Sequence, residues 1–240
     1  MDTTISLAHL ASLMGLVAAL GLGGCGGDDS PAPPAPTPAP TPAPTPAPTP
    51  APTPAPPPAP DLAFATPLDA GSTAEGGSVV SYAYAADAAA LAAGTITFAS
   101  GAESFAATLA ATQSYAGAAI RLYAPGNSST GTAAPLDASA YSQLRIHLAS
   151  TTDATLTLKL QPSPVAADGC APTAQAVVSA TLSEFVIDLD DATFALPSYC
   201  AASGSTLHQM LAGLYVVDVV NDAPAAGVHD LVVGSVSLVP

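Results

Sequence analysis

The chain has 240 residues, with 18 acidic side chains, three basic ones and a formal net charge of −15. Proteins that bind DNA or RNA neutralise phosphates with lysine and arginine, and anionic lipid headgroups repel an acidic surface. The composition therefore excludes nucleic acid as a partner, and it excludes electrostatic attachment to a membrane surface.

The first 24 residues are expected to be an export signal. An apolar run of thirteen residues ends at Leu22, and it is shorter than the roughly 20 residues that a membrane span needs. The sequence Leu22-Gly23-Gly24-Cys25 resembles the lipobox of bacterial lipoproteins. The resemblance implies removal of residues 1–24, acylation of Cys25, and a lipid anchor in the bacterial cell envelope. The expected membrane is the outer one, with the domain periplasmic or surface-exposed.

Residues 25–60 are expected to form a disordered linker rich in proline, alanine and threonine. Between Pro31 and Pro60, 17 of 30 residues are proline. Proline lacks the amide donor that helices and sheets require, so an extended polyproline spacer is predicted. The alternative is a ligand for proline-reading domains. The pattern favours a spacer that holds the following domain away from the membrane.

Cys170 and Cys200 remain as an even pair once Cys25 is assigned to the lipid. An exported protein lies in an oxidising compartment, where paired cysteines form disulfides. A metal site would require more ligands at closer spacing. The sequence therefore predicts a Cys170–Cys200 disulfide.

Residues 61–240 are expected to form an all-β domain, because short alternating runs are separated by Gly, Pro, Ser and Asp. The first predicted strands are Val79–Ala85, Thr95–Ala99 and Ala118–Ala124. The alanine-rich stretch Ala85–Ala93 fits a helical turn or a loop equally well.

The clearest strand pattern lies within Leu136–Leu160. Aliphatic residues alternate with polar ones in two runs, separated by a polar turn. Alternate side chains of a strand point to opposite faces, so an antiparallel hairpin with one solvated face is predicted. Arg145, His147 and Lys159 would lie on that polar face, as lining of a shared groove or as a solvated sheet surface.

The remaining strands are predicted at Glu184–Leu189, Leu214–Val220 and Asp230–Val239, with a helical turn over Thr206–Ala212. Eight or nine strands in one layer would leave a hydrophobic face bare. Two packed sheets are therefore expected.

Residues 136–146, which read LDASAYSQLRI, and the following Leu-Thr-Leu-Lys-Leu strand resemble the middle of galactose-binding-like jelly rolls. These include carbohydrate-binding modules attached to bacterial glycosidases. The resemblance implies a β-sandwich jelly roll over about Phe64–Val239 and a non-catalytic domain that binds glycans. The chain has no tryptophan, the residue on which such modules often stack a sugar ring.

The ligand-binding candidates are Tyr82 and Tyr84, with Arg145 and His147 as hydrogen-bonding partners. Sugar C–H groups pack on aromatic faces while a few polar groups fix the hydroxyls. Tyr82 and Tyr84 share one sheet face, so they form a platform if that face is solvated and belong to the core if it is not. Further candidates are Tyr115, Tyr123, Tyr141 and Tyr199, with Arg121 and Gln143 as polar partners.

No catalytic residue, cofactor or metal site is predicted. The chain has neither a Gly-x-Ser-x-Gly nor a His-Glu-x-x-His motif. Five acidic residues at strand ends fit either a structural calcium site or solvent-exposed turns: Asp188, Asp190, Asp191, Asp218 and Asp222.

The sequence thus predicts an envelope lipoprotein that displays a carbohydrate-binding-like jelly roll. The alternative is a structural or assembly lipoprotein whose β-sandwich binds a protein partner. Exposed tyrosines beside a groove would favour a sugar. A contiguous apolar patch without a groove would favour a protein.

Overall fold

The computed structural model describes residues 57, 60–92, 94–152, 154–165, 169–200 and 206–240. The predicted export signal, Cys25 and nearly all of the linker lie outside the described residues. Within the described ranges, no helix has the length and apolar character needed to cross a bilayer.

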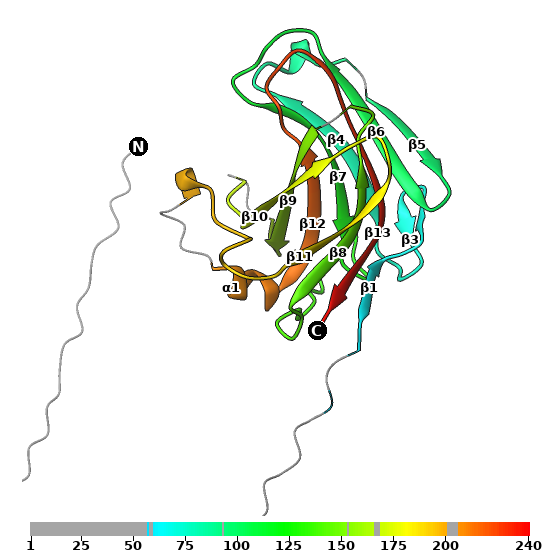
Figure 1. Ribbon diagram of the computed structural model, residues 1–240, viewed down its shortest axis with the longest axis vertical. Coiled ribbons are helices and arrows are strands. Elements are labelled where there is room, and N and C mark those ends of the chain that lie inside the picture. The colour runs from blue at the N-terminus through cyan, green and yellow to red at the C-terminus, as the bar shows by residue number, and fades with distance from the viewer. Residues whose placement is uncertain (1–56, 58–59, 93, 153, 166–168, 201–205) are drawn as a thin grey trace, which may run out of the picture. The chain divides into compact units, whose positions relative to one another are not determined.

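Two antiparallel sheets pack face to face (Figure 1). The six-stranded sheet has the order β11 (Ser183–Asp188), β8 (Gln143–Ala149), β13 (Gly227–Val239), β6 (Ala102–Leu109) and β5 (Thr95–Ala99), and β1 (Leu62–Ala65) also pairs with β13. The five-stranded sheet has the order β10 (Thr173–Val178), β9 (Ala154–Pro162), β12 (Leu214–Asn221), β7 (Ala116–Tyr123) and β4 (Val79–Ala85). A short pair, β2 (Leu68–Asp69) and β3 (Ser72–Thr73), lies outside both sheets.

The strand order is that of a jelly roll. Of the eight strands from β6 to β13, one sheet holds β6-β13-β8-β11 and the other holds β7-β12-β9-β10. Two four-stranded antiparallel sheets that divide eight successive strands in this way are the jelly-roll arrangement. The predicted all-β sandwich is therefore confirmed by the connectivity of the chain itself, with β4 and β5 extending the two sheets.

The core lies between the sheets and is filled by the aliphatic residues that the alternating runs predict. Leu144, Ile146 and Leu148 of β8 and Leu156, Leu158 and Leu160 of β9 all have no exposed surface. The predicted hairpin is nevertheless wrong, because β8 pairs with β11 and β13 whereas β9 pairs with β10 and β12. The turn between them carries the chain from one sheet to the other, so their apolar faces meet across the core.

Within the part of the chain that the structure describes, the helical segments are short and lie between strands. They are the 3₁₀ turns Ala88–Ala90 (η1) and Ser198–Cys200 (η2) and the helix Leu207–Leu211 (α1). The predicted helical turn at Thr206–Ala212 is confirmed and begins with a capping box: the Thr206 hydroxyl accepts from the Gln209 amide, and the Gln209 side chain accepts from the Thr206 amide. The alanine-rich stretch before β5 contains the η1 turn.

The Cys170–Cys200 disulfide is present, with Cα atoms 5.3 Å apart. It joins the segment before β10 to the η2 turn, and both half-cystines are buried. The bridge therefore ties the region around Tyr199 to the edge of the five-stranded sheet.

Candidate functional site

The outer face of the five-stranded sheet carries the predicted tyrosine pair. In β4, Ser81 pairs with the fully buried Ile120 of β7. Because side chains alternate along a strand, Tyr82 and Tyr84 point the other way, onto the outer face, where both are half-buried. Their ring centroids lie 6.3 Å apart and their planes are inclined by 34°. The two rings therefore form a platform on the solvated face and are not part of the core.

Small residues in β7 make room for these rings. Gly117 pairs with Tyr84 and Ala119 pairs with Tyr82. A Cβ atom at Gly117 would lie 2.7 Å from the Tyr84 hydroxyl oxygen and 2.8 Å from the Asn221 carbonyl oxygen. A side chain at this position would therefore displace the Tyr84 ring from the sheet surface.

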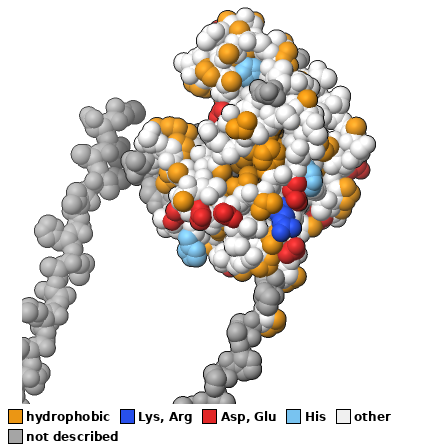
Figure 2. All heavy atoms as spheres, in the orientation of Figure 1, with side chains coloured by type: hydrophobic (Ala, Val, Ile, Leu, Met, Phe, Trp, Pro, Cys, Tyr) orange, Lys and Arg blue, Asp and Glu red, His pale blue; other side chains and the backbone are white. Residues whose placement is uncertain are grey.

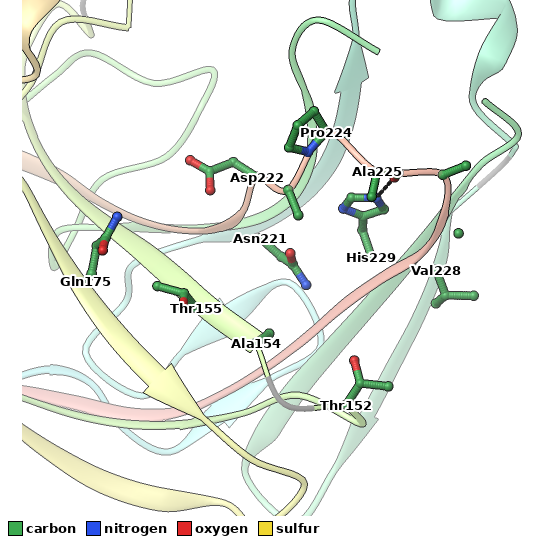
Figure 3. A pocket seen from close by; sticks show the side chains of 13 residues that line it. Thr152, Ala154, Thr155, Gln175, Asn221, Asp222, Pro224, Ala225, Val228 and His229 are labelled. Atoms are coloured by element: carbon green, nitrogen blue, oxygen red, sulfur yellow. Dashed lines mark hydrogen bonds between the residues drawn. The ribbon is translucent and has the colours of Figure 1, made fainter. Parts of the chain in front are cut away.

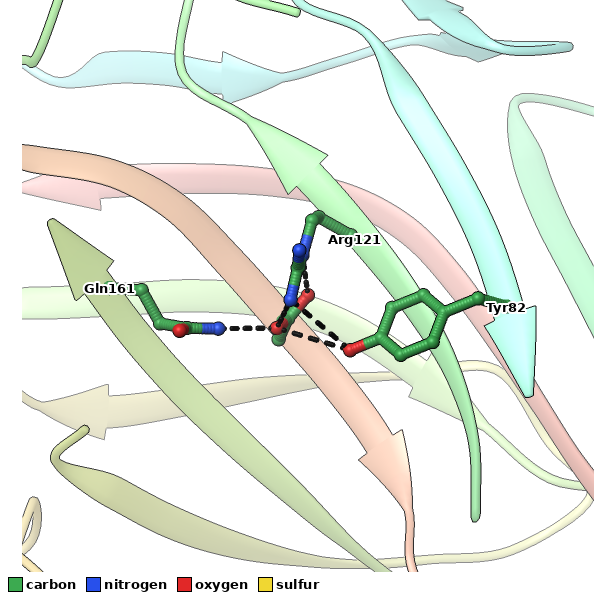
Figure 4. A network of polar contacts seen from close by, with 4 residues as sticks. Tyr82, Arg121 and Gln161 are labelled. Atoms are coloured by element: carbon green, nitrogen blue, oxygen red, sulfur yellow. Dashed lines mark hydrogen bonds and ion pairs between the residues drawn. The ribbon is translucent and has the colours of Figure 1, made fainter. Parts of the chain in front are cut away.

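The buried carboxylate of Asp218 holds the polar side chains beside the tyrosine platform in place. Arg121 of β7 and Asp218 of β12 are directly opposed, with Arg121 Nε donating to Asp218 Oδ1 at 2.7 Å and Nη2 donating to Oδ2 at 2.5 Å. Gln161 of β9 donates to the same Oδ2. The Tyr82 hydroxyl donates to Oδ2 at 3.3 Å and accepts from Arg121 Nη2 at 3.2 Å. Four strands thus contribute to one network (Figure 4).

Burial controls the charge states in this network. The Asp218 side chain is 1% exposed and that of Arg121 is 21% exposed. Burial alone would lower the pKa of Arg121, but the hydrogen bonds and charge of Asp218 outweigh it and raise that pKa. Burial, together with the charge of Asp218 or Asp222, raises the pKa of Tyr82 and Tyr84 above the ordinary value of 10.0. The platform is therefore uncharged at neutral pH, and the adjacent arginine is neutralised.

A groove of about 710 Å³ opens over this platform. We call it the tyrosine groove. Its lining includes four tyrosines and five charged or polar residues: Tyr82, Tyr84, Tyr115, Tyr199, Arg121, Lys159, Gln161, Asp218 and Asp222. Tyr115 and Tyr199 are 60% and 68% exposed. Four aromatic rings and several hydrogen-bonding groups therefore surround one open space.

Two further cavities lie beside the tyrosine groove and share lining residues with it or with each other. A cavity of about 340 Å³ shares Lys159, Tyr199 and Asp222 with it. A third cavity of about 540 Å³ (Figure 3) shares Gln175 and Asp222 with the second and extends over the loop between β12 and β13 to the first residues of β13. We call the three adjoining cavities the outer-face channel.

The other end of this face is closed by a small apolar cluster. Tyr123 and Tyr215 are buried and meet edge to face, with centroids 5.4 Å apart. The Tyr215 hydroxyl donates to the Ser128 carbonyl oxygen at 2.7 Å. A bulge in β12 between Leu214 and Val216 accompanies this placement. Tyr123, which was a candidate ring, is therefore structural.

The structure separates the four predicted ligand-binding residues into two groups. Arg145 and His147 lie on β8 of the six-stranded sheet, whereas Tyr82 and Tyr84 lie on β4 of the other sheet. Of the two alternatives for Arg145, His147 and Lys159, the shared groove does not form, because β8 and β9 lie in different sheets and make no hairpin. His147 Nδ1 instead lies 2.9 Å from the Ser235 hydroxyl oxygen.

The other candidates also divide by position. Tyr115, Tyr199 and Arg121 line the tyrosine groove, whereas Gln143 hydrogen-bonds Asp188 on the other sheet, and Tyr141 packs against the core. Gln161 was missed, since it joins the site only through cross-strand pairing with β12. In the sequence, the indication of its role is its position at the polar end of the alternating run that forms β9.

The acidic residues weighed for calcium have other partners. Asp218 is paired with Arg121. Asp190 accepts from the amides of Ala192 and Thr193, and these hydrogen bonds lower its pKa. Among the described residues, no group of three or more His, Cys, Asp or Glu side chains gathers to hold a metal ion.

Charge on the surface is sparse and mostly negative. The face seen in Figure 2 shows basic atoms at a single place, with acidic side chains beside them, and hydrophobic side chains near its centre. This agrees with three basic residues against 18 acidic ones in the whole chain.

Comparison with known proteins gives no family. No protein-family profile and no curated protein matches the chain. Solved structures with similar architecture include the family 11 carbohydrate-binding module of the cellulosomal cellulase Lic26A-Cel5E of Clostridium thermocellum, at 12% identity and a TM-score of 0.43 over 67% of this chain and 86% of that one.

Two further likenesses were found. One is the family 11 module from Clostridium thermocellum in complex with a β-1,3-1,4-mixed-linked tetrasaccharide, at 11% identity and a TM-score of 0.44 over 75% of this chain and 95% of that one. The other is PfGH50B, at 14% identity and a TM-score of 0.41 over 67% of this chain and 22% of that one. At these low scores, the assignment of the fold rests on the strand order of the chain.

Proposed function

We propose that the domain binds a neutral glycan chain along the outer-face channel and does not act on it. The observation that carries this proposal is the pair of half-buried rings of Tyr82 and Tyr84, which lies in an open groove of about 710 Å³. Aromatic faces of this kind offer the flat apolar surface on which sugar C–H groups pack. Cavities of several hundred Å³ with a few oriented polar groups are typical ligand sites.

The polar groups of the groove suit hydroxyls better than charges. Arg121 is engaged by Asp218 through two hydrogen bonds, so its charge is already compensated. Lys159 and Asp222 line the groove as one positive and one negative group. An anionic glycan would meet little net attraction here and would be repelled by the acidic chain. A neutral glycan would not be repelled by the acidic chain, and its binding would not depend on net charge attraction.

The length of the channel favours a polymer over a single sugar. The three cavities run across all five strands, from β4 at one edge to β10 at the other, and share lining residues where they meet. A chain of several sugar rings would contact the tyrosines at one end and Gln175 towards the other. A monosaccharide would use one cavity only.

The test is affinity electrophoresis of the full chain in gels that contain soluble polysaccharides, with neutral glucans and galactans in one set and uronic-acid or sulfated polymers in the other. Retardation by a neutral polymer, and none by an anionic one, is the expected result. Retardation by anionic polymers alone would contradict the proposal. So would the absence of retardation by every polymer, which would favour the protein-binding alternative.

The rival function, docking of a protein partner, has less support at this site. A protein-binding face was expected to be a contiguous apolar patch without a groove. The outer-face channel is hollowed and mixes rings with hydrogen-bonding side chains. We therefore give priority to the glycan.

We also propose that the domain is displayed from a lipid-anchored Cys25 on the proline-rich linker. The support is the sequence Leu22-Gly23-Gly24-Cys25 and the 17 prolines between Pro31 and Pro60. A Cys25→Ser variant should lose incorporation of labelled fatty acid and leave the membrane fraction. Unchanged membrane retention with no acyl label on the wild-type chain would refute the anchor and leave glycan binding untouched.

A further inference from the structure

Strand β5 is an unprotected edge of the six-stranded sheet. Among the strands that the structure describes, it pairs with β6 alone, and it lies at the outside of the sandwich in Figure 1. All five of its residues, Thr95–Ala99, are exposed. Natural proteins usually protect such an edge with charges, proline or a covering segment, and β5 contains no charged residue or proline.

The turn between β5 and β6 determines which backbone N–H and C=O groups of β5 point towards the free edge. A two-residue turn, Ser100 and Gly101, closes the β5–β6 hairpin with φ angles of 52° and 76°. A turn with positive φ at both positions makes Ala99 and Ala102 a hydrogen-bonded pair. Hydrogen-bonded and non-hydrogen-bonded pairs then alternate along the strands. The N–H and C=O groups of Ile96 and Phe98 therefore point away from β6, towards the free edge.

The side chains of the same two residues are apolar and uncovered. Ile96 is opposite Phe105, which is 4% exposed and belongs to the core, so Ile96 and Phe98 lie on the core-facing side of the sheet. Ile96 is nevertheless 55% exposed and Phe98 36% exposed. Apolar surface and unpaired backbone groups thus coincide on one strand.

We propose that β5 pairs with β5 of a second copy of this chain, antiparallel about a two-fold axis at Thr97. In this register Ile96 of each copy is opposite Phe98 of the other, so both outward-facing residues form hydrogen-bonded pairs. Two such pairs with two bonds each give about four intermolecular hydrogen bonds. Aromatic residues opposite β-branched ones, and threonine opposite threonine, are favourable cross-strand pairs.

A second copy fits this edge better than an unrelated strand does. The strand reads Thr-Ile-Thr-Phe-Ala. In an antiparallel pair centred on Thr97, the apolar side chains are opposite each other and the backbone groups that face the edge can form hydrogen bonds. No like charges oppose each other, although the whole chain carries −15. A two-fold contact of this kind uses the same patch on both copies and closes at a dimer. The short strand predicts a weak dimer.

The test is cysteine cross-linking of the full chain in a Cys25→Ser background. The pair at Thr97 is a non-hydrogen-bonded pair with Cα atoms about 4.5 Å apart, within the range of about 4.4–6.8 Å that a disulfide requires. Thr97→Cys should therefore form a covalent dimer under mild oxidation. The matched control is Thr95→Cys, which is also exposed but would lie about 13 Å from its equivalent, four residues along the strand. It should stay at background.

A further variant separates specific pairing from collision. Adding Phe98→Glu to Thr97→Cys should abolish the covalent dimer, because two carboxylates would enter the pairing edge. The outcome that overturns the proposal is equal cross-linking of the Thr97→Cys and Thr95→Cys chains, whether both form dimers or neither does. Persistence of the dimer in the Phe98→Glu chain would also overturn it.

Discussion

Asp218 organises the candidate site at the level of single residues. It is 1% exposed and accepts hydrogen bonds from Arg121, Gln161 and Tyr82. The Arg121 guanidinium also lies over the Tyr82 ring, with its carbon 5.1 Å from the centroid. A buried carboxylate with paired donors holds its neighbours in one arrangement, so this network fixes the position of one platform ring.

Removal of Arg121 should therefore be costly. An Arg121→Leu variant leaves the buried charge of Asp218 uncompensated, and we expect it to lose about 3–5 kcal/mol of unfolding free energy. Urea unfolding measures this loss. The combined Arg121→Leu and Asp218→Leu variant should recover much of it, because the buried charge is then absent. A double variant as unstable as the sum of the two single variants would show that the residues are not coupled.

The raised pKa values of Tyr82 and Tyr84 give a pH dependence with a defined sign. The unfolded chain releases these protons at the ordinary pKa of about 10, before the folded chain does. Their contribution to stability is therefore fully present below about pH 10 and falls as the pH rises above that value. Unfolding measured across this range should show a shallower loss in Tyr84→Phe than in the wild type. An equal slope in both would contradict the assignment.

At the level of elements, the connection from β8 to β9 shows what the sequence can determine. Alternation correctly predicts both strands and their buried residues, and β4 and β5 begin and end where the pattern places them. The alternation of apolar and polar residues cannot identify which strands pair, since two strands that face each other across a core have the same pattern as the two strands of a hairpin. Arg145 and Lys159 were therefore assigned to one face, although they lie in different sheets.

Two alanine-rich strands, β6 and β10, escaped prediction for a related reason. β6 reads AESFAATL and β10 reads TAQAVV, and alanine has little β-propensity. They are strands because neighbouring strands supply their partners. Tyr82 and Tyr84 could be placed on one face by their spacing alone. Gln161 and Asp218 could not be assigned to the same site, because they meet only when β9 and β12 pair.

The disulfide supports one wall of the tyrosine groove. Cys200 ends η2, and its neighbour Tyr199 lines the groove. The bridge spans 30 residues, so replacement of both cysteines by serine should cost roughly 3–4 kcal/mol in the chain-entropy model. It should also weaken glycan binding by releasing Tyr199. Calorimetric titration of the variant checks this, with the chemically reduced wild type as its control. Unchanged affinity would show that the bridge serves stability alone.

At the scale of the whole molecule, charge distinguishes the proposed ligand. The chain carries −15, yet the ionic groups of the groove are paired or balanced. Salt screens interactions between charges but leaves packing on rings and hydrogen bonds with hydroxyls largely unchanged. Affinity for a neutral glycan should therefore change less than about twofold when the salt concentration is raised from about 0.05 M to about 0.5 M. A steep fall would identify a charged ligand and contradict the proposal.

The two proposed surfaces lie on different sheets. The tyrosine groove belongs to the five-stranded sheet, and the pairing edge β5 belongs to the six-stranded sheet. Pairing through β5 would use none of the residues that line the tyrosine groove. A dimer would carry two channels and would gain avidity for a polymer long enough to reach both.

The most direct measurement of the central claim is a calorimetric titration of the full chain with the neutral glycan that retards it most. Tyr84→Ala should weaken binding by about tenfold to a hundredfold, because removing an anchoring aromatic ring costs on the order of 1.4–3 kcal/mol. Val186→Ala, an exposed apolar position on the six-stranded sheet, should bind as the wild type does. Unchanged affinity in Tyr84→Ala, or an equal loss in Val186→Ala, would contradict glycan binding in the outer-face channel.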